Sequence, residues 1–289
     1  MTAKNKRRKE MHKYIFMRFP GGKPKAFTLS YDDCVEQDVP FIEMCDKYGL
    51  KATFNVNAGL WAPEGTVFPK GQIHRHVTKS TADAVYNKNG HEVATHSFTH
   101  PWLEKLSPAN VVDEIMKDRE ALEEQFGCII NGHAYPYGTY SDTVVDCLKA
   151  CGIVYARTVK PTYKFDIPTD WLRLDPTCHH DDAKVFDLLD KFINLKTEHP
   201  KMFYLWGHTF ELEANNNWDH MEKICETVAN KDDIWYASNI DIYNYVKAYE
   251  SLVFSADATR VHNPSAQTVY LVCNKKDYVI GAGESVVLG

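Results

Sequence analysis

The chain has 289 residues, of which 44% are hydrophobic and 25% charged, and its formal net charge is −6. This size and composition are typical of a globular protein that folds without a disulfide or metal framework. The negative net charge argues against a nucleic-acid partner, which would require a clustered positive surface. No stretch approaches the roughly 20 apolar residues of a membrane span, so no membrane association is predicted.

A basic run, Lys4–Lys9, stands near the start of the chain. We predict that residues 1–20 form a basic, partly disordered N-terminal segment, because charge runs at termini are usually solvated. The apolar stretch Tyr14–Met17 is too short for the core of a signal peptide, and no small-residue cleavage site follows it. The sequence therefore predicts a cytoplasmic protein, or a secreted one if an upstream signal has been removed.

Short apolar runs typical of β-strands alternate with helical stretches over residues 21–250. The clearest helix is predicted over 108–126, where Ser107 is a good N-cap and Gly127 ends the helix. Alternating strands and helices indicate parallel pairing through βαβ crossovers, and seven or eight such units predict an α/β barrel. No glycine-rich phosphate loop follows the first strand, which disfavours a dinucleotide-binding fold. The predicted strands are 26–30, 51–56, 92–95, 132–135, 153–158, 171–174, 202–206 and 234–237.

The pattern changes after residue 250. Residues 251–289 contain short β-type runs separated by turn residues, as in Asn274–Asp277 and Gly281–Gly283. We predict one catalytic domain over 21–250 and a small C-terminal β appendage over 251–289. The appendage either closes one end of the barrel, which we prefer, or binds carbohydrate or a second copy of the chain in a homo-oligomer.

Polar residues follow several of the predicted strands, where α/β barrels gather their functional groups. Asp32 and Asp33 follow the first strand, and His96 and His100 follow the third. Other residues at strand ends are Tyr135–Gly138 after the fourth strand, Asp175 after 171–174 and His208 after 202–206. Five placements on one rim are difficult to attribute to chance.

The two aspartates and two histidines suit a metal site. His96 and His100 are spaced i, i+4, so that both rings can face one cation. Adjacent buried carboxylates such as Asp32 and Asp33 repel one another unless one binds a cation. By themselves the histidines could be ordinary polar residues, and one aspartate could cap the following helix. Together the four residues can hold one divalent metal and leave a carboxylate for proton transfer.

The motifs around these residues resemble those of a known family. Thr28–Cys34 resembles the Thr-Phe-Asp-Asp-Gly element of the polysaccharide deacetylases with a NodB-type domain, which are similar to carbohydrate esterase family 4. His96–Pro101 is similar to their His-Ser/Thr-x-x-His-Pro element. Pro136–Gly138 matches the third motif in part, and Leu205–His208 resembles the late Leu-x-His element. The resemblance covers residues 25–250.

This resemblance implies a distorted (β/α) barrel and assigns roles to individual residues. It implies that Asp32 is the general base and His208 the general acid, and that the backbone N–H of Tyr137 helps to hold an oxyanion. The implied metal ligands are Asp33, His96 and His100. Substrate-binding roles are expected for Pro136, Tyr137, Trp206 and Asp175. An Asp-His-His set accepts zinc, cobalt, nickel or manganese, and zinc is the metal we expect.

The chain departs from the family pattern at two positions. Cys34 stands where the family has glycine, and Ala134 stands where the third motif has the arginine that orients the base. We hypothesise that Arg173 supplies the missing guanidinium.

Three further polar groups have alternative interpretations. Cys178–Asp182 could bind a second metal, but a helix start with acidic residues near the positive dipole end is preferred. His74 and His76 are interpreted as exposed loop residues. Glu211 could tune His208 or bind substrate, or simply lie in an exposed loop.

The leading functional hypothesis is a metal-dependent hydrolase that removes an acetyl group from an N-acetylated sugar or polysaccharide by attack of metal-bound water. One alternative is a NodB-like amidohydrolase, similar to the cytosolic allantoinases, that cleaves a C–N bond of a small amide substrate. A second alternative is a metal-holding barrel that binds carbohydrate without turnover.

Overall fold

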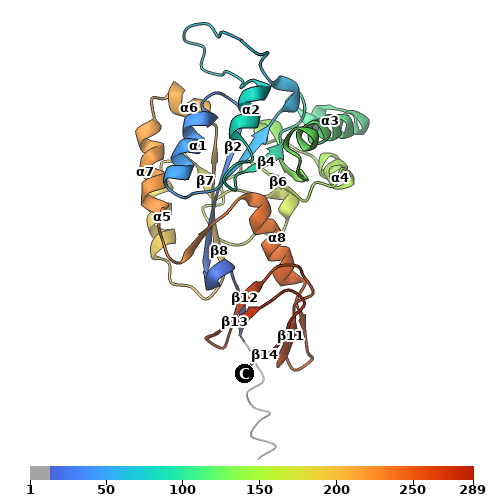
Figure 1. Cartoon of the computed structure of the whole chain (residues 1–289), viewed down its shortest axis with the longest axis vertical. Coiled ribbons are helices and arrows are strands. Elements are labelled where there is room, and N and C mark those ends of the chain that lie inside the picture. The colour runs from blue at the N-terminus through green and yellow to red at the C-terminus, as the bar shows by residue number, and fades with distance from the viewer. Residues whose placement is uncertain (1–13) are drawn as a thin grey trace, which may run out of the picture.

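The computed structural model describes residues 14–289. The basic run Lys4–Lys9 lies outside the described residues. Figure 1 shows a parallel sheet surrounded by helices, with a small β unit at one end of the molecule. Within residues 14–289, no helix has the length and apolar character needed to cross a membrane.

The sheet consists of parallel strands in the order β6-β5-β4-β3-β2-β8-β7, and β9 also pairs with β2. Strand β2 lies at the centre, and all eight of its residues are buried. The curled sheet with its surrounding helices confirms the predicted (β/α) barrel. The strands are β2 (Lys25–Asp32), β3 (Ala52–Val56), β4 (Glu92–Thr95), β5 (Gly132–Ala134), β6 (Tyr155–Arg157), β7 (Cys178–His179), β8 (Lys201–Gly207) and β9 (Ile234–Tyr236).

The gap between β6 and β8 is bridged by a short extended segment. The N–H of Leu174 donates to Ala156 on the β6 side (2.9 Å), and the N–H of Thr177 donates to Tyr204 of β8 (2.8 Å). The predicted strand over 171–174 is wrong. Asp170 caps the N–H of Leu172, and residues 171–173 form a 3₁₀ turn, so that only Leu174 makes a β-bridge.

Helices cover the outer face of the sheet (Figure 1). Helix α3 spans the predicted range, because Ser107 accepts the N–H of Asn110 at its start and Gly127 adopts a left-handed conformation at its end. The α-helices are α1 (Asp38–Lys47), α2 (Lys79–Val85), α3 (Pro108–Phe126), α4 (Asp142–Ala150), α5 (Val185–Asn194), α6 (Thr209–Ala214), α7 (Trp218–Val228) and α8 (Asn239–Glu250). Single 3₁₀ turns are η2 (Pro20–Gly22), η3 (Ala58–Leu60), η4 (Leu103–Lys105), η5 (Pro136–Gly138) and η6 (Trp171–Arg173).

Side chains alternate between two cores along each strand. On β8, Phe203 and Leu205 pack into the cluster beneath the outer helices, whereas Met202 and Tyr204 pack into a second cluster with Trp171. This alternation follows from the two-residue period of a strand. At the rim, Asp32 at the end of β2 lies 3.8 Å from His208, which follows β8.

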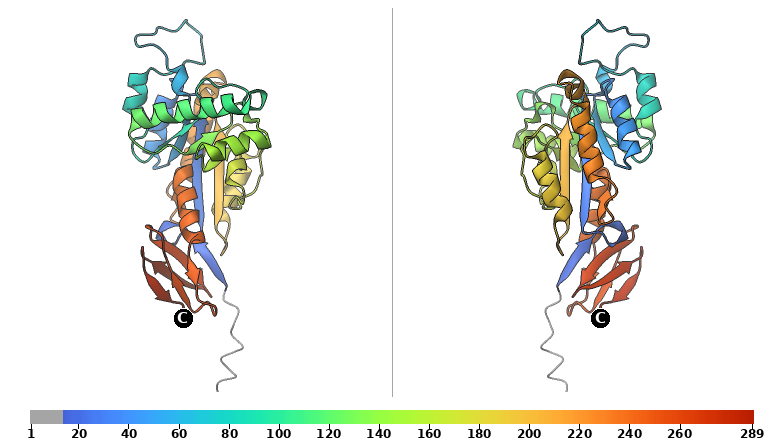
Figure 2. Two further views of the ribbon diagram at one scale, coloured as in Figure 1. Left: turned by 90° about the vertical axis from the view of Figure 1, so that its right-hand side faces the viewer. Right: turned by 90° about the vertical axis from the view of Figure 1, so that its left-hand side faces the viewer.

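The C-terminal residues, together with β1 from the other end of the chain, form two small antiparallel sheets, β1-β12-β13 and β10-β11-β14. Strand β1 comes from the predicted N-terminal segment and pairs with β12, far away in the sequence (Figure 2). Tyr245 of α8 joins this unit to the barrel. Its hydroxyl donates to the carbonyl oxygen of Arg18 and accepts from the N–H of Tyr270. The strands are β1 (Ile15–Arg18), β10 (Val253–Phe254), β11 (Arg260–His262), β12 (Val269–Cys273), β13 (Lys276–Ile280) and β14 (Ser285–Val287).

Candidate active site

The chain turns sharply where β2 ends at the barrel rim. Asp32 is the last residue of β2, and Asp33 and Cys34 both have positive φ angles, 80° and 46°. Non-glycine residues rarely adopt this conformation, and it is concentrated at functional sites. As a consequence, the two carboxylates contact different partners although they are adjacent in sequence.

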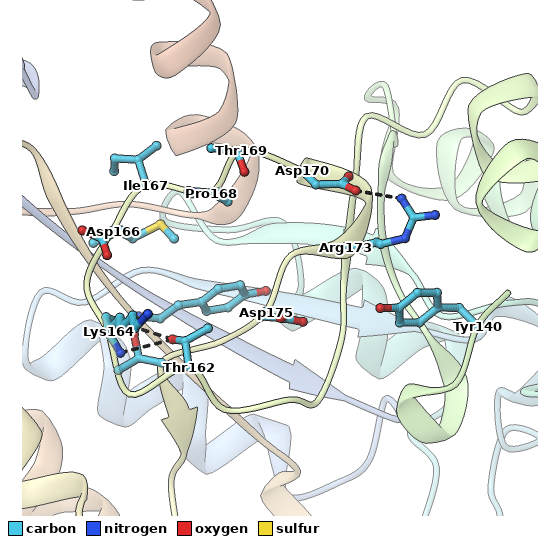
Figure 3. Close-up of a pocket in the computed structure, with 13 residues that line it drawn as sticks. Tyr140, Thr162, Lys164, Asp166, Ile167, Pro168, Thr169, Asp170, Arg173 and Asp175 are labelled. Carbon is cyan, nitrogen blue, oxygen red and sulfur yellow. Dashed lines mark hydrogen bonds and ion pairs between the residues drawn. The ribbon is translucent and has the colours of Figure 1, made fainter. Parts of the chain in front are cut away.

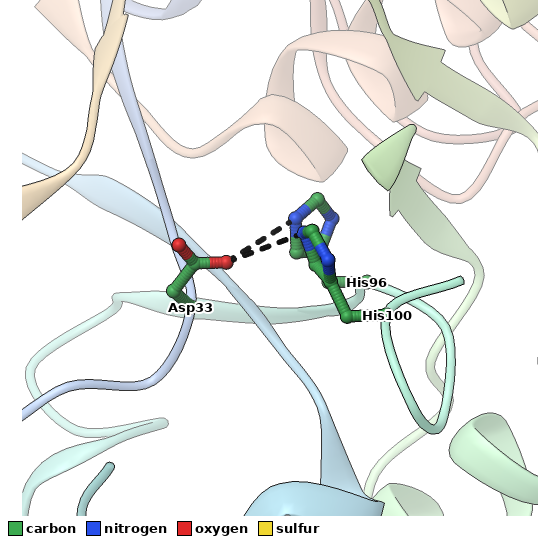
Figure 4. Close-up of side chains that lie close together, drawn as sticks. All are labelled: Asp33, His96 and His100. Carbon is green, nitrogen blue, oxygen red and sulfur yellow. Dashed lines mark ion pairs between the residues drawn. The ribbon is translucent and has the colours of Figure 1, made fainter. Parts of the chain in front are cut away.

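Asp33, His96 and His100 converge at this rim (Figure 4). Asp33 Oδ1 lies 3.5 Å from His96 Nε2 and 3.6 Å from His100 Nε2. Ligands about 2.0–2.1 Å from a tetrahedral ion lie roughly 3.3 Å apart, close to these separations. The structure thus brings together the three residues that were predicted as metal ligands.

The surroundings of the two histidines bear on whether they can bind a cation. His96 Nδ1 lies 2.8 Å from the carbonyl oxygen of Ala134, which can only accept, so that the proton is on Nδ1. Burial and the neighbouring His96 lower the pKa of His100 to about 4, which keeps this imidazole neutral at neutral pH. Two imidazoles and a carboxylate suit a divalent ion of the zinc type.

Asp32 lies outside this group of three and has its own partners. The Arg157 guanidinium donates to Oδ2, and Asn55 Nδ2 donates to Oδ1 over 2.8 Å. Although burial favours the neutral acid, Arg157, together with His96 and His208, holds the pKa of Asp32 below its usual value. Asp32 is therefore an oriented, ionised carboxylate, and it is not one of the three residues that could hold a metal.

The prediction that Arg173 orients Asp32 is wrong. Arg173 instead pairs with Asp170 at 2.7 Å and with Asp142 at 2.6 Å. The arginine at Asp32 is Arg157, the last residue of β6, which lies directly opposite Ala134 of β5 in the strand register. The guanidinium expected from β5 is therefore supplied by the adjacent strand, across the small alanine side chain.

Arg173 lines a separate cavity of about 460 Å³ between the 162–177 segment and β8 (Figure 3). Asp175 lines the same cavity and accepts from the Thr158 hydroxyl. The structure therefore places Asp175 with Arg173 and not with the three predicted ligands, and its substrate-binding role stays a prediction.

His208 faces Asp32 from the end of β8. Its Nε2 lies 3.8 Å from Asp32 Oδ2, and its Nδ1 lies 3.2 Å from Glu211 Oε1. Burial opposes the charged imidazolium, but Glu211, Asp32 and Asp33 together raise the pKa of His208. The ring of Trp206 lies between Arg157, with Cζ 4.5 Å from the ring centroid, and His208. His208 thus lies beside Asp32, and the predicted substrate-binding role of Trp206 stays a prediction.

Two aromatic residues form the rim beside His100. Tyr137 has a φ of 58° and is 49% exposed, and its ring stacks on Trp102 at 3.9 Å with a 6° interplanar angle. The His100 ring lies 4.5 Å from the Tyr137 ring. The preceding Pro136 is buried and begins the η5 turn. Tyr137 is thus positioned to contact a substrate at the predicted ligands.

His179, His180 and Glu211 form a second cluster with ligand-like spacing. The backbone N–H of Asp181 donates to His179 Nδ1, which leaves the ring proton on Nε2, 3.1 Å from Glu211. A protonated Nε2 cannot bind a cation, so we assign no metal to this cluster. His179 instead contacts Oε2 of Glu211, while Oε1 of the same carboxylate faces His208. Gly207 is required here, because a Cβ at this position would collide with the His180 ring.

Three buried polar residues that sequence reasoning missed hold the loops of the site. Asn57 Nδ2 donates to the carbonyls of His96 and Ser97, at 2.6 Å each. Asp118 of α3 accepts the N–H of His96 (3.0 Å) and of Ala58 (2.7 Å). Asn55 and Asn57 at the end of β3 could have been found, because polar side chains there interrupt an apolar strand. Asp118 had no comparable signal within its helix.

Replacing Asp118 with alanine is expected to destabilise the protein by about 1–3 kcal/mol, since the N–H of Ala58 loses its acceptor and the N–H of His96 keeps only the carbonyl oxygen of Val56 (2.9 Å). Urea unfolding would measure the change. Glu120, exposed on the same helix, provides the control, and its alanine variant should change stability by less than about 0.5 kcal/mol. Equal effects of the two substitutions would contradict the assigned role of Asp118.

The fold and the site together define a (β/α)-barrel protein with a carboxylate and two imidazoles gathered at the carboxyl ends of its strands. Residues 20–156 match the family model described as polysaccharide deacetylase. This match confirms the predicted resemblance to the polysaccharide deacetylases for this part of the chain.

Two curated relatives match part of the chain. It is 25% identical over 115 residues to the uncharacterized protein YlxY of Bacillus subtilis (40% of this chain, 30% of the relative). It is 26% identical over 124 residues to the peptidoglycan-N-acetylglucosamine deacetylase PgdA of Listeria monocytogenes (42% of this chain, 23% of the relative). The chain therefore spans less than a third of the length of either relative.

Solved structures share the fold. A Mycobacterium smegmatis protein, solved as a candidate polysaccharide deacetylase, superposes with a TM-score of 0.57 at 18% identity, covering 80% of this chain and 93% of the other. The Xyl-CE4 domain of a multidomain xylanase, from the hindgut metagenome of Trinervitermes trinervoides, gives a TM-score of 0.53 at 14% identity, with coverage of 78% and 92%. At these identities the likeness concerns the fold alone.

Proposed function

We propose that the protein is a metal-dependent deacetylase that hydrolyses the N-acetyl group of an amino sugar, in a glycan or oligosaccharide, to acetate and a free amine. The main support is the arrangement at the rim, where Asp33, His96 and His100 converge and Asp32 stands beside them, ionised and unligated. The family match over residues 20–156 supports the same reaction class.

In this proposal the three converging side chains hold one divalent ion of the zinc type. When bound, such an ion polarises the amide carbonyl and lowers the pKa of an attacking water. Asp32 accepts the proton of that water, and its pairing with Arg157 and Asn55 fixes the carboxylate for this step. The backbone N–H of Tyr137 is the proposed donor to the developing oxyanion, an interaction worth about 3 kcal/mol.

His208 completes the reaction by protonating the leaving amine. The 3.8 Å between its Nε2 and Asp32 Oδ2 supports an acid and a base that act on the same substrate bond. Glu211 favours the protonated imidazole that this step requires. The proton accepted by Asp32 and the one given by His208 balance the conversion of amide and water into acid and amine.

The exposed Trp102–Tyr137 stack beside His100 favours a sugar substrate, because aromatic side chains contact the apolar faces of sugar rings. PgdA, named as a peptidoglycan-N-acetylglucosamine deacetylase, suggests that class of glycan as a first choice. A barrel that only binds carbohydrate is disfavoured, because holding a metal requires neither the Arg157–Asp32 pair nor the Glu211–His208 pair.

The proposal is tested by elemental analysis together with a panel of N-acyl compounds: chitooligosaccharides, peptidoglycan fragments and small amides. We expect one tightly bound divalent ion per chain and release of acetate from an amino-sugar substrate. Chelation should abolish turnover, and added Zn²⁺ or Co²⁺ should restore it. Release of formate or ammonia from a small amide instead would favour the small-amide hydrolase. Protein that holds no ion after incubation with Zn²⁺ would rule out the proposal.

A further inference from the structure

His74 contacts Oδ2 of Asp33, the carboxylate oxygen that does not face His96 and His100. Its Nε2 lies 3.3 Å from Asp33 Oδ2, whereas Oδ1 faces His96 and His100. This hydrogen bond helps to hold the pKa of Asp33 below its usual value although burial opposes ionisation. His74 is thus an exposed loop residue, as predicted, and in addition contacts a predicted metal ligand.

The segment that carries His74 is built into the rim. It belongs to the long connection between η3 and α2, which projects beyond the barrel in Figure 1. The base of this loop is anchored to the turn that carries Asp33 by two backbone hydrogen bonds. The N–H of Val77 donates to the carbonyl oxygen of Cys34 (2.9 Å), and the N–H of Glu36 donates to that of Arg75 (2.8 Å). Cys34 Sγ also lies 3.6 Å from His76 Nδ1.

Arg75 fixes the loop to both sides of the site. Its guanidinium pairs with Glu36, which follows the Asp33 turn (2.6 Å), and with both carboxylate oxygens of Glu213 on α6 (2.8 and 3.0 Å). Gln37 adds a hydrogen bond to the carbonyl of Ile73 (2.8 Å). These contacts immobilise the residues on either side of His74, so that its ring position does not depend on a free loop.

The His74 ring is also packed in place. It lies edge-on to Phe210, at 4.9 Å between centroids, and edge-on to His76, at 4.8 Å. A histidine held in this way on an otherwise exposed loop is a directed donor to one oxygen of Asp33. Carboxylates that bind metal need such outer partners, and losing one typically weakens metal affinity about 10–100-fold.

We propose that His74 is a positioning residue for the metal site: it holds Asp33 Oδ2, so that Oδ1 alone faces the cation. This inference rests on the ligand set proposed above. It also assigns a role to Cys34, whose thiol, in place of the family glycine, packs against the loop that delivers His74.

The test is Zn²⁺ affinity, measured by competition with a chromophoric chelator, so that it does not depend on turnover. We expect His74→Ala to weaken Zn²⁺ binding about 10–100-fold. His74→Gln, whose side-chain N–H₂ can replace the Nε2–H donor, should stay within a few-fold of wild type. His262→Ala, in the distant strand β11, is the matched control and should not change affinity. Unchanged melting of the metal-free variants would exclude a merely structural effect.

Two results would overturn the inference: wild-type affinity in His74→Ala, or a loss in His74→Gln as large as that in His74→Ala. Arg75→Ala provides a second test, because releasing the loop should weaken Zn²⁺ binding in the same direction and add little to His74→Ala. Failure of the wild-type protein to bind Zn²⁺ would count against the proposed function instead, so the two failures are distinguishable.

Discussion

Replacing Arg157 with methionine is expected to lower kcat by about 10²–10⁴-fold, because Asp32 would lose the partner that keeps it ionised and oriented as a base. The same change should destabilise the fold by about 3–5 kcal/mol, since a buried carboxylate would be left without its counter-charge. Acetate release and urea unfolding measure the two effects.

A double variant separates the effects of Arg157 on catalysis and on stability. Asp32→Asn combined with Arg157→Met removes both charges and should recover most of the lost stability, but not the activity. Arg173→Met is the matched control and should leave kcat within a few-fold of wild type, because this guanidinium pairs with Asp142 and Asp170 at the surface. A collapse of turnover in Arg173→Met, with Arg157→Met active, would reinstate the assignment made from sequence.

Replacing His208 with alanine is expected to lower kcat by about 10²–10⁴-fold, the usual contribution of a general acid. In the proposed mechanism, the wild-type rate requires Asp32 ionised and His208 protonated. Because the pKa of Asp32 is lowered and that of His208 is raised, the acid limb should lie below the ordinary aspartate range and the alkaline limb above the ordinary histidine range.

Glu211→Gln tests the sign of this pH dependence. Without the anion beside Nδ1, the His208 pKa should fall, so that the alkaline limb of kcat/KM moves to lower pH while the acid limb set by Asp32 stays in place. Asp219→Asn, on α7, is a control of equal charge change. An alkaline limb that does not move in Glu211→Gln would exclude Glu211 as the group that favours protonation of His208.

The barrel and the convergence of Asp33, His96 and His100 could be predicted because their determinants are local. Asp33 directly follows β2, His96 directly follows β4 and His100 lies four residues further on, and the capping residues Ser107 and Gly127 define α3. The function of such residues depends mainly on where a strand ends, and hydrophobic periodicity reveals that position.

Arg157 and His74 could not be predicted because their roles depend on tertiary neighbours. Arg157 reaches Asp32 only because β6 pairs with β5 in a register that places it opposite Ala134. His74 reaches Asp33 because contacts from Arg75 to two other elements hold the loop. The prediction of a strand over 171–174 was wrong although the deciding signal is local. The apolar run was interpreted as a strand, whereas the preceding Asp170 caps a turn that begins there.

The pairing of β1 with β12 affects how the chain folds during its synthesis. Synthesis on the ribosome delivers Ile15–Arg18 early and its partner Val269–Cys273 only near the end, so that the first strand has no edge to join for most of translation. A shortened chain that starts at residue 21 would leave β12, with its Leu271 and Val272, as a bare edge open to aggregation. Expression vectors for this protein should therefore retain the residues ahead of the barrel.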